Sequence, residues 1–376
     1  MAVLGARAAI DLAMPSTIDA SRVFNFQMRN GKTGPEIISE AAAVIGAVNE
    51  EIMRRWGGLI YITDAPYSYY RQGTTGQADK TPKKVEFKIA EAVRGSTGGH
   101  MLVKEDYEDA LGWTPLYLRD AFDAQVTADL DEIGSRWRNR VETDVLTRMF
   151  SNAVNAVGSG YDVPWAIGSG TAPYQPPSYS SNTFDTTHTH FKFTSTGSID
   201  ATKAAALLEL MVGEMVHHEG LQGRYVAIVS SADVASYAGM TGFVKFIPTD
   251  VQVVAGGSAA PVYIAPRELE GMPGEIFGFY LSARGPVVEL RAEVRVPTGY
   301  AWMGKSFGQN APRNPIAVRE HPGIGFGLRT DPQLTTSLQP ELAYLLFKAT
   351  HGVGVNDRLN GVAGKIGASY TAPTIS

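Results

Sequence analysis

Residues 59–153 constrain the fold of this chain most, because a long two-stranded arm leads there directly into a long amphipathic helix. Apolar and charged residues alternate over 84–89, as they do in a strand with one solvated face. The strand 59–70 is its expected partner, and the tip 72–82 between them is rich in turn-forming residues. A hairpin of this length is marginally stable in water unless its apolar side is covered. If the arm projects from the body, another subunit is its natural cover, which indicates an assembly component.

The helix that follows the arm is predicted to run from Pro115 to residue 153. Its apolar residues recur at helical spacing and form one stripe, which should bury against a neighbouring layer. The stripe consists of Phe122, Val126, Leu130, Ile133, Trp137, Val141 and Val145. An earlier helix is expected from Pro35 to Trp56, because proline suits the first helical turn and two glycines follow as a stop signal. The apolar side of this helix is formed by Ile38, Ala41, Ile45, Val48 and Ile52.

The composition excludes several classes of protein. With 44% hydrophobic and 19% charged residues, the chain of 376 residues has the composition of a folded protein. A formal net charge of −5 argues against tight, sequence-specific binding of nucleic acid. The absence of cysteine excludes disulfides, thiolate catalysis and thiolate metal sites. No apolar run is long enough for a membrane span, so we expect a soluble protein made in a cytoplasm.

The second half of the chain is expected to be a mixed α and β region. It follows a Gly/Pro/Ser/Thr-rich loop at 157–190 that should not contribute to a core. Asp200 is expected to cap a helix that ends at Gly220, with Leu207, Leu208, Met211 and Met215 on its apolar side. Strands are predicted at 225–229, 243–247, 251–255, 262–265, 276–281, 288–296, 316–320, 324–329 and 341–350, before a Gly-rich tail. In 288–296 the alternating charges should pair across a solvated face.

One loop matches two catalytic motifs. The segment 299–306 satisfies the P-loop pattern with Lys305 and Ser306, and 304–308 satisfies the G-x-S-x-G pattern of serine hydrolases. Both motifs need a helix directly after the serine, and the two prolines that follow cannot begin one. The preferred interpretation is a strand that ends in a Gly/Pro loop. A nucleotide or serine hydrolase stays as the lowest alternative, and no catalytic or cofactor-binding residue is assigned.

Histidines occur in two places where a metal is conceivable. Asp185, His188 and His190 have the spacing of a metal cluster, because H-x-H places both rings on one side of a strand. His217 and His218 fall in the last turn of a predicted helix, where positive charge suits the helix dipole. No third-ligand motif is evident. We therefore interpret both groups as solvated loop and capping residues, with no metal site.

Positive charge along the arm is the best candidate for a contact surface. It comes from Lys80, Lys83, Lys84, Arg94 and Lys104. These side chains are interpreted as docking onto an acidic neighbour, and the first four are the candidate inter-subunit contacts. A solvated hairpin face is the alternative interpretation.

The order of these elements, which ends in strands around FGLRTDPQLTTSLQPELAYLLFKATHGVGV, resembles the major capsid protein of tailed bacteriophages, the α+β fold of Hong Kong 97 type. The resemblance covers the chain from about residue 35 to 360. It implies an N-terminal arm and helix (1–56), an extended hairpin or E-loop (57–112), a peripheral domain (113–198) with a spine helix (115–153) and the loop 157–190, an axial domain (199–310), and return strands of the peripheral domain with a tail (311–376).

The resemblance also implies a function. The chain would assemble, without being an enzyme, into hexamers and pentamers of an icosahedral shell around double-stranded DNA, which it would contact non-specifically. It would reside in the virion, made in the host cytoplasm, with no cofactor and no membrane contact. Scaffolding, portal and decoration proteins are the candidate partners. Only about 34 residues precede the first helix, which implies a separate scaffolding protein or a shell that assembles without one.

Two points stay open within the resemblance. Some members of the family crosslink a lysine of the E-loop to an asparagine of a neighbour, and Lys83 or Lys84 would occupy the donor position. No motif assigns the asparagine, so the crosslink is not carried over. An encapsulin-like nanocompartment shell of the same fold is the alternative function.

Overall fold

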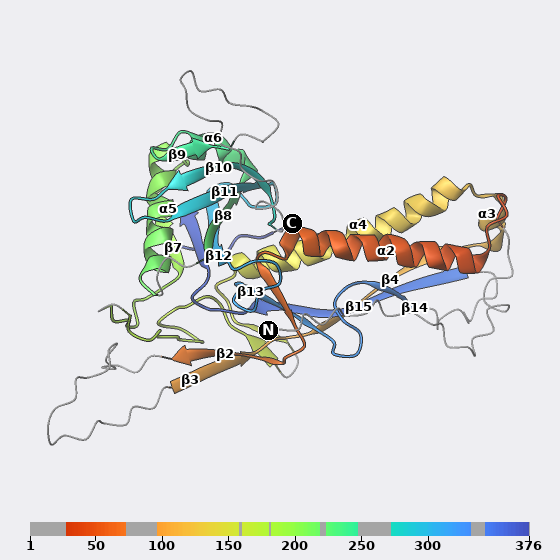
Figure 1. Cartoon of the computed structure of the whole chain (residues 1–376), viewed down its shortest axis with the longest axis horizontal. Coiled ribbons are helices and arrows are strands. Elements are labelled where there is room, and N and C mark those ends of the chain that lie inside the picture. Colours follow the sequence, from red (N-terminus) through yellow and green to blue (C-terminus); the bar gives the residue numbers. More distant parts are fainter. Residues whose placement is uncertain are drawn as a thin grey trace, which may run out of the picture. The chain divides into compact units, whose positions relative to one another are not determined.

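The computed structural model of the chain describes residues 28–72, 96–157, 160–179, 182–218, 223–246, 272–331 and 343–375. The chain divides into two compact units. The smaller consists of Met1–Ala47, Glu108–Ser135 and Leu328–Lys348, and the larger consists of Val48–Tyr107, Arg136–Gly327 and Ala349–Ser376. Figure 1 labels the elements by which each unit is described below.

The first helices are α2 (Gly34–Trp56), α3 (Pro115–Asp120) and α4 (Asp123–Phe150). The prediction of one continuous helix over 115–153 is therefore wrong. The backbone is extended at Ala121 (φ −67°, ψ 146°), which ends α3. A new start follows, because the Gln125 side chain accepts a hydrogen bond from the Phe122 backbone N–H (2.8 Å), as in a capping box. Phe122, the first residue of the predicted stripe, is 61% exposed.

The rest of the predicted apolar stripe on α4 is confirmed, since all six following members are buried. These are Val126, Leu130, Ile133, Trp137, Val141 and Val145. On α2 the buried stripe begins at Ile37 and not at the predicted Ile38, which is half-buried. In the larger unit Trp137 Nε1 donates to Asn49 Oδ1 (3.0 Å) and joins the two helices.

A seven-stranded sheet forms the core of the larger unit, in the order β7-β16-β12-β8-β11-β10-β9. The strands are β7 (Phe191–Thr194), β8 (Arg224–Ser230), β9 (Phe243–Lys245), β10 (Glu275–Leu281), β11 (Val287–Glu293), β12 (Tyr300–Ser306) and β16 (Val362–Ile366). β8 and β11 are parallel, as are β7 and β16, and the other neighbours are antiparallel.

Helix α5 (Ala201–Val216) covers one face of this sheet (Figure 1). Its buried side chains include Leu207, Leu208, Met211 and Met215, as predicted. Asp200 caps the helix by accepting from the Lys203 backbone N–H (2.9 Å), which confirms the predicted start. The helix ends at Val216 and not at Gly220. The helical segment after β8 is short and consists of η1 (Ser231–Asp233) and α6 (Val234–Ala238).

The prediction of a solvated charged face on β11 is wrong. Glu289, Arg291 and Glu293 are at most 5% exposed. The strand lies between β8 and β10, and its charges are paired in place: Glu289 forms ion pairs with Arg224 and Arg291. Val294, which falls inside the predicted strand 288–296, is 81% exposed because the strand ends before it.

A second sheet contains β1 (Ile60–Thr63), β4 (Glu105–Trp113), β13 (Ile316–Glu320), β14 (Arg329–Asp331) and β15 (Ala343–Val355). In the larger unit β1 pairs in parallel with β13, and β13 pairs antiparallel with the C-terminal half of β15. In the smaller unit β14 pairs with residues 346–348 of β15. The predicted strand 59–70 is therefore divided, because its first half joins this sheet and not a hairpin.

The second half of that predicted strand does form a two-stranded ribbon. Strand β2 (Tyr67–Gln72) pairs antiparallel with β3 (Ser96–Met101), side by side in Figure 1. The predicted alternation at 84–89 and nearly all of the tip 72–82 lie outside the described residues. So do the predicted strands 251–255 and 262–265.

Two segments predicted to lie outside the core belong to it. The loop 157–190 contains the end of a small hairpin, β5 (Asn155–Val157) with β6 (Gly160–Asp162), and buries Trp165 completely. Trp165 Nε1 donates to Met149 O (2.8 Å). The predicted Gly-rich tail includes β16, which pairs with β12 and β7. Among the described helices, none has the length and apolar character that crossing a bilayer requires.

Candidate functional site

The inner face of the β2–β3 ribbon is held to the body of the larger unit by three polar side chains. Ser68 Oγ donates to Asn356 O (2.8 Å), and Arg358 Nη1 donates to Tyr70 Oη (3.1 Å). His100 is buried, with Nε2 2.8 Å from Val355 O. The root of the ribbon is therefore fixed to its own subunit.

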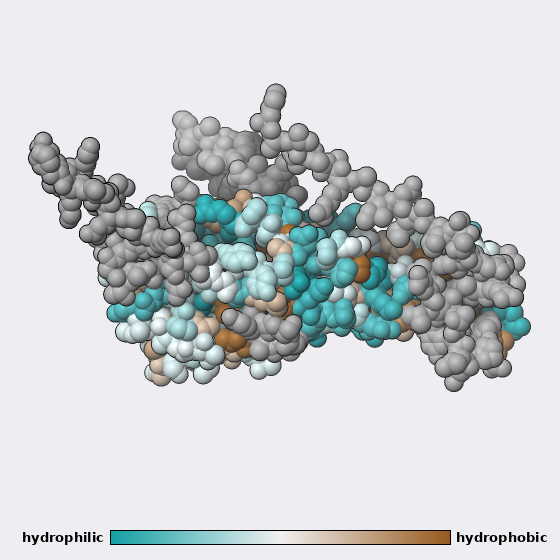
Figure 2. Space-filling model, turned by 90° about the horizontal axis from the view of Figure 1, so that it is seen from below, coloured by the Kyte–Doolittle hydropathy of each residue, from teal (hydrophilic) through white to brown (hydrophobic). Residues whose placement is uncertain are grey.

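The outer face of the ribbon carries two exposed tyrosines. Tyr67 is 46% exposed and Tyr69 is 72% exposed, with their ring centroids 6.2 Å apart. Gly99 lies opposite Tyr69, so no cross-strand side chain covers that ring. In the view of Figure 2 most of the described surface is hydrophilic or mixed, with scattered hydrophobic spots. Two neighbouring aromatic rings on a narrow ribbon are a candidate contact surface.

A second exposed apolar group lies on the seven-stranded sheet. Leu281 and Val287 are cross-strand partners, and Val244 lies on the same face of the adjacent strand β9. Their exposed fractions are 51%, 52% and 47%. Their neighbours Tyr280 and Val288 point to the opposite face, into the core with α5. This group, the outer-face patch, is thus on the face of the sheet that α5 does not cover.

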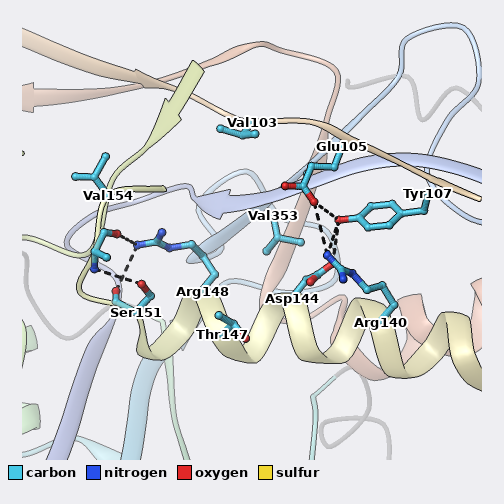
Figure 3. A pocket seen from close by; sticks show the side chains of 12 residues that line it. Val103, Glu105, Tyr107, Arg140, Asp144, Thr147, Arg148, Ser151, Val154 and Val353 are labelled. Atoms are coloured by element: carbon cyan, nitrogen blue, oxygen red, sulfur yellow. Dashed lines mark hydrogen bonds and ion pairs between the residues drawn. The ribbon is translucent and has the colours of Figure 1, made fainter. Parts of the chain in front are cut away.

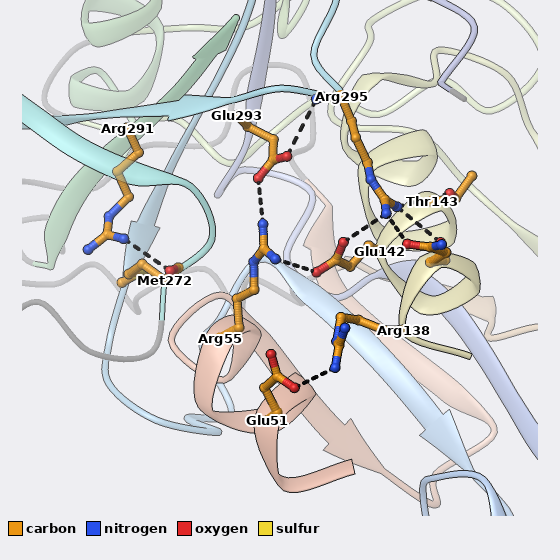
Figure 4. Close-up of polar contacts among 10 residues, drawn as sticks. Glu51, Arg55, Arg138, Glu142, Thr143, Met272, Arg291, Glu293 and Arg295 are labelled. Atoms are coloured by element: carbon orange, nitrogen blue, oxygen red, sulfur yellow. Dashed lines mark hydrogen bonds and ion pairs between the residues drawn. The ribbon is translucent and has the colours of Figure 1, made fainter. Parts of the chain in front are cut away.

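A buried charge network joins α2, α4 and the end of β11 (Figure 4). Arg55 pairs with Glu142 (2.8 Å) and Glu293 (3.0 Å), and Arg295 pairs with Glu142 (3.2 Å). The two carboxylates are buried, while the arginines keep partial access to water. Charges in such positions are stable only when paired, so the network fixes the angle between the helices and the sheet.

A polar pocket of about 290 Å³ lies between β4, β15 and α4 (Figure 3). Tyr107 Oη donates to Glu105 (2.8 Å), and Arg140 donates to Tyr107 Oη (3.1 Å) and to Asp144 (3.0 Å). Burial raises the pKa of Tyr107, so its hydroxyl stays protonated as a donor. At the other end Arg148 donates to Ser151 and Ala153 carbonyl oxygens. The side-chain contacts of Tyr107 and Arg140 in this pocket are hydrogen bonds and ion pairs that join β4 to α4.

The predicted motif around Lys305 and Ser306 lies at the end of strand β12. Both residues are buried, and the Lys305 backbone N–H donates to Asn360 Oδ1 (2.7 Å). Ser306 Oγ donates to Gly58 O (2.6 Å). No helix begins after Ser306 in the described segment 307–315, so neither a phosphate cradle nor a nucleophile elbow is present there. The interpretation as a strand end is confirmed.

The prediction of solvated loop and capping histidines is wrong for three of the four residues, while His217 is the partly exposed C-cap of α5 as predicted. His188, His190 and His218 are buried together with Glu214, and we refer to these four residues as the His–Glu cluster. Asp185 is exposed, accepts from the Thr187 N–H and takes no part. The signal missed in the sequence is Glu214 four residues before His218, which places both near one end of α5.

The candidate contact residues Lys80, Lys83, Lys84 and Arg94 lie outside the described residues. Lys104 lies in the turn between β3 and β4. The structure therefore leaves the predicted docking role of these side chains as a prediction.

Comparison with solved structures finds related folds. A chain from Mycobacterium phage Patience has a TM-score of 0.61 at 20% sequence identity, over 93% of this chain and 92% of that chain. A chain from the mature capsid of bacteriophage PhiM1 has a TM-score of 0.45 at 11% identity, over 82% and 86%. A virus-like particle from Pyrococcus furiosus has a TM-score of 0.42 at 8% identity, over 88% and 100%. No protein-family model and no curated protein sequence matches the chain.

The similarity to the Patience chain spans nearly the whole length of both chains and shows a shared fold. The resemblance to the capsid-protein fold of tailed phages, stated from the order of the elements, is thereby confirmed at the level of the fold.

Proposed function

We propose that this chain is the major capsid protein of a tailed, double-stranded DNA bacteriophage and that it assembles with its own copies into the head shell. The observation that carries the proposal is the β2–β3 ribbon, which is bonded to its subunit along one face and exposes Tyr67 and Tyr69 on the other. A two-stranded ribbon has too little core to be stable alone. A neighbouring copy that covers the tyrosines supplies the missing apolar contact.

The other elements support the same function. The outer-face patch offers a second contact surface on the seven-stranded sheet, as a subunit with several neighbours requires. The Arg55–Glu142 network stiffens the subunit, so that contacts at its ends keep a fixed geometry. The proposal assigns the ribbon to an E-loop, α4 to a spine helix, and the seven-stranded sheet to an axial domain that meets its copies in hexamers and pentamers. It gives the chain no enzymatic activity.

The experiment that tests the proposal is electron microscopy of the purified protein, with light scattering to follow assembly. Closed particles are the expected result. The double variant Tyr67→Ser/Tyr69→Ser should lose particles while the subunit keeps its circular dichroism and its melting temperature. Phe193→Ser is the control, because Phe193 is also exposed (48%) but lies on β7 and not on the ribbon. Normal particles from the double variant would contradict the role of the ribbon.

The contents of particles recovered from their natural source separate the two shell functions. Double-stranded DNA inside supports the phage capsid. Protein cargo without DNA supports the encapsulin-like nanocompartment instead.

A further inference from the structure

The His–Glu cluster brings together two segments of the larger unit. His188 and His190 lie directly before β7, Glu214 lies in the last turn of α5, and His218 follows the end of that helix. One donor atom from each residue lies within 4.8 Å of all the others. All four side chains are at most 9% exposed. Four ligand-type groups thus converge on one buried point.

The contacts inside the cluster are not those of a satisfied hydrogen-bond network. His190 Nε2 and His218 Nε2 face each other at 2.9 Å, and Glu214 Oε1 lies 2.9 Å from His188 Nδ1. Within the described part of the chain, Glu214 Oε1 lies among the histidine rings and accepts no hydrogen bond of standard geometry. Buried polar atoms without partners are costly, which points to a missing ligand.

The surrounding residues orient the donors towards the centre. His190 Nδ1 donates to Gly361 O (2.7 Å), which leaves the lone pair of Nε2 directed into the cluster. Lys192 forms an ion pair with Glu214 Oε2, so Oε1 is the oxygen that remains for the centre.

The donor set and its spacing suit one metal. Three imidazole nitrogens and one carboxylate oxygen form a typical tetrahedral zinc set, in which neighbouring donors are about 3.4 Å apart. The spacings between donor atoms in the cluster, from 2.9 Å between His190 and His218 up to at most 4.8 Å, lie on both sides of this value. Small rotations of the rings bring the four donors to zinc geometry.

Access to the cluster is provided from one side. His217 is 29% exposed on its side chain, and its Nε2 lies 3.4 Å from Glu214 Oε1. A cavity of about 250 Å³ reaches His188 and His217, with Phe184 in its wall. The Phe184 ring packs 4.6 Å from the His218 ring, measured between centroids, and shields the cluster from water.

We propose that the His–Glu cluster binds one Zn²⁺ ion and that the ion joins the segment before β7 to the end of α5. Since four protein donors complete the tetrahedron, the site is structural and not catalytic. The site does not depend on the capsid function, and either proposal can fail alone.

The test uses the full-length protein after chelation with EDTA and buffer exchange. Titration with ZnCl₂ should show one binding site per chain, and the melting temperature should rise when Zn²⁺ is added. Replacement by Co²⁺ should give the intense visible bands of tetrahedral coordination. If the unaltered chain shows neither one-to-one binding nor tetrahedral Co²⁺ bands, the proposal is overturned.

Variants locate the site. His188→Gln and His218→Gln each remove one donor and should weaken Zn²⁺ binding by more than about 100-fold, beyond the effect typical of outer-sphere changes. Asp185→Asn and His321→Gln are matched controls, a carboxylate of the same loop and a histidine elsewhere, and should bind Zn²⁺ as before. Full affinity in a well-folded His188→Gln variant would refute the assignment. If the donor variants do not fold, the stoichiometry and the Co²⁺ spectrum of the unaltered chain decide.

Discussion

The substitution Glu142→Gln tests the charge network that fixes the helices to the seven-stranded sheet. Glutamine keeps the size of the side chain, so no cavity forms and only the charge is removed. Glu142 is 4% exposed on its side chain and forms ion pairs with Arg55 at 2.8 Å and Arg295 at 3.2 Å. The variant leaves both guanidinium groups without this shared carboxylate.

The expected loss of stability depends on the partners that each arginine retains in the variant. Removing one partner of a buried ion pair costs about 3–5 kcal/mol. Arg55 retains Glu293 at 3.0 Å, and Arg295 retains the Asn139 carbonyl oxygen at 3.1 Å. Both arginines are also partly solvated, at 36% and 21% exposure. We therefore expect the lower end, a loss of about 3 kcal/mol in the free energy of unfolding.

The assay is urea unfolding of the unassembled subunit, followed by tryptophan fluorescence. Glu51→Gln is the control, because Glu51 pairs with Arg138 (2.7 Å) between the same two helices but is 39% exposed. An exposed pair contributes at most about 1 kcal/mol. If the two variants lose the same stability, within about 0.5 kcal/mol, the reasoning from burial is refuted.

Three further changes are expected to act on the subunit. Asn314→Ala should cost about 2–4 kcal/mol in urea unfolding, because the buried amide donates to Gly57 O and Ile60 O and the substitution removes both hydrogen bonds. An unchanged unfolding midpoint would contradict this. Gly352→Ala should abolish soluble expression, because the added Cβ would lie 1.5 Å from a backbone oxygen. Gly46→Ala places its Cβ where no other atom lies within 4 Å, so it should stabilise α2 by about 1 kcal/mol. The backbone N–H of Lys203 lowers the pKa of Asp200. The stabilisation from this cap is therefore present above the ordinary carboxyl pKa and is lost as the pH falls through the lowered value. Asp200→Asn should flatten the acid limb of a profile of melting temperature against pH, and an unaltered limb would refute the capping role.

The helices were predictable from sequence because their pattern is local. The stripe on α4 from Val126 to Val145 follows directly from helical spacing. The break between α3 and α4 could not be predicted in this way, because Phe122 continues the apolar spacing and only the hydrogen bond to the Gln125 side chain shows where the new helix starts. The capsid-type fold was recognised from the order of such elements.

The β-structure was harder to predict from the sequence, because the strands that pair lie far apart in it. The charges of β11 alternate as on a solvated face, yet Arg224 from β8 covers Glu289. The tail segment was missed as a strand because its glycines lower strand propensity, although Gly364 allows Met211 of α5 to approach closely. The His–Glu cluster combines residues from two segments that are far apart in the sequence, so no single motif contained it.

Cryo-electron microscopy of the assembled protein tests the central claim most directly. We expect a closed shell in which Tyr67 and Tyr69 of each subunit are buried against a neighbouring copy. A protein that stays a 40.4 kDa monomer at every concentration and salt condition tried, or a shell in which both tyrosines face solvent, would contradict the account.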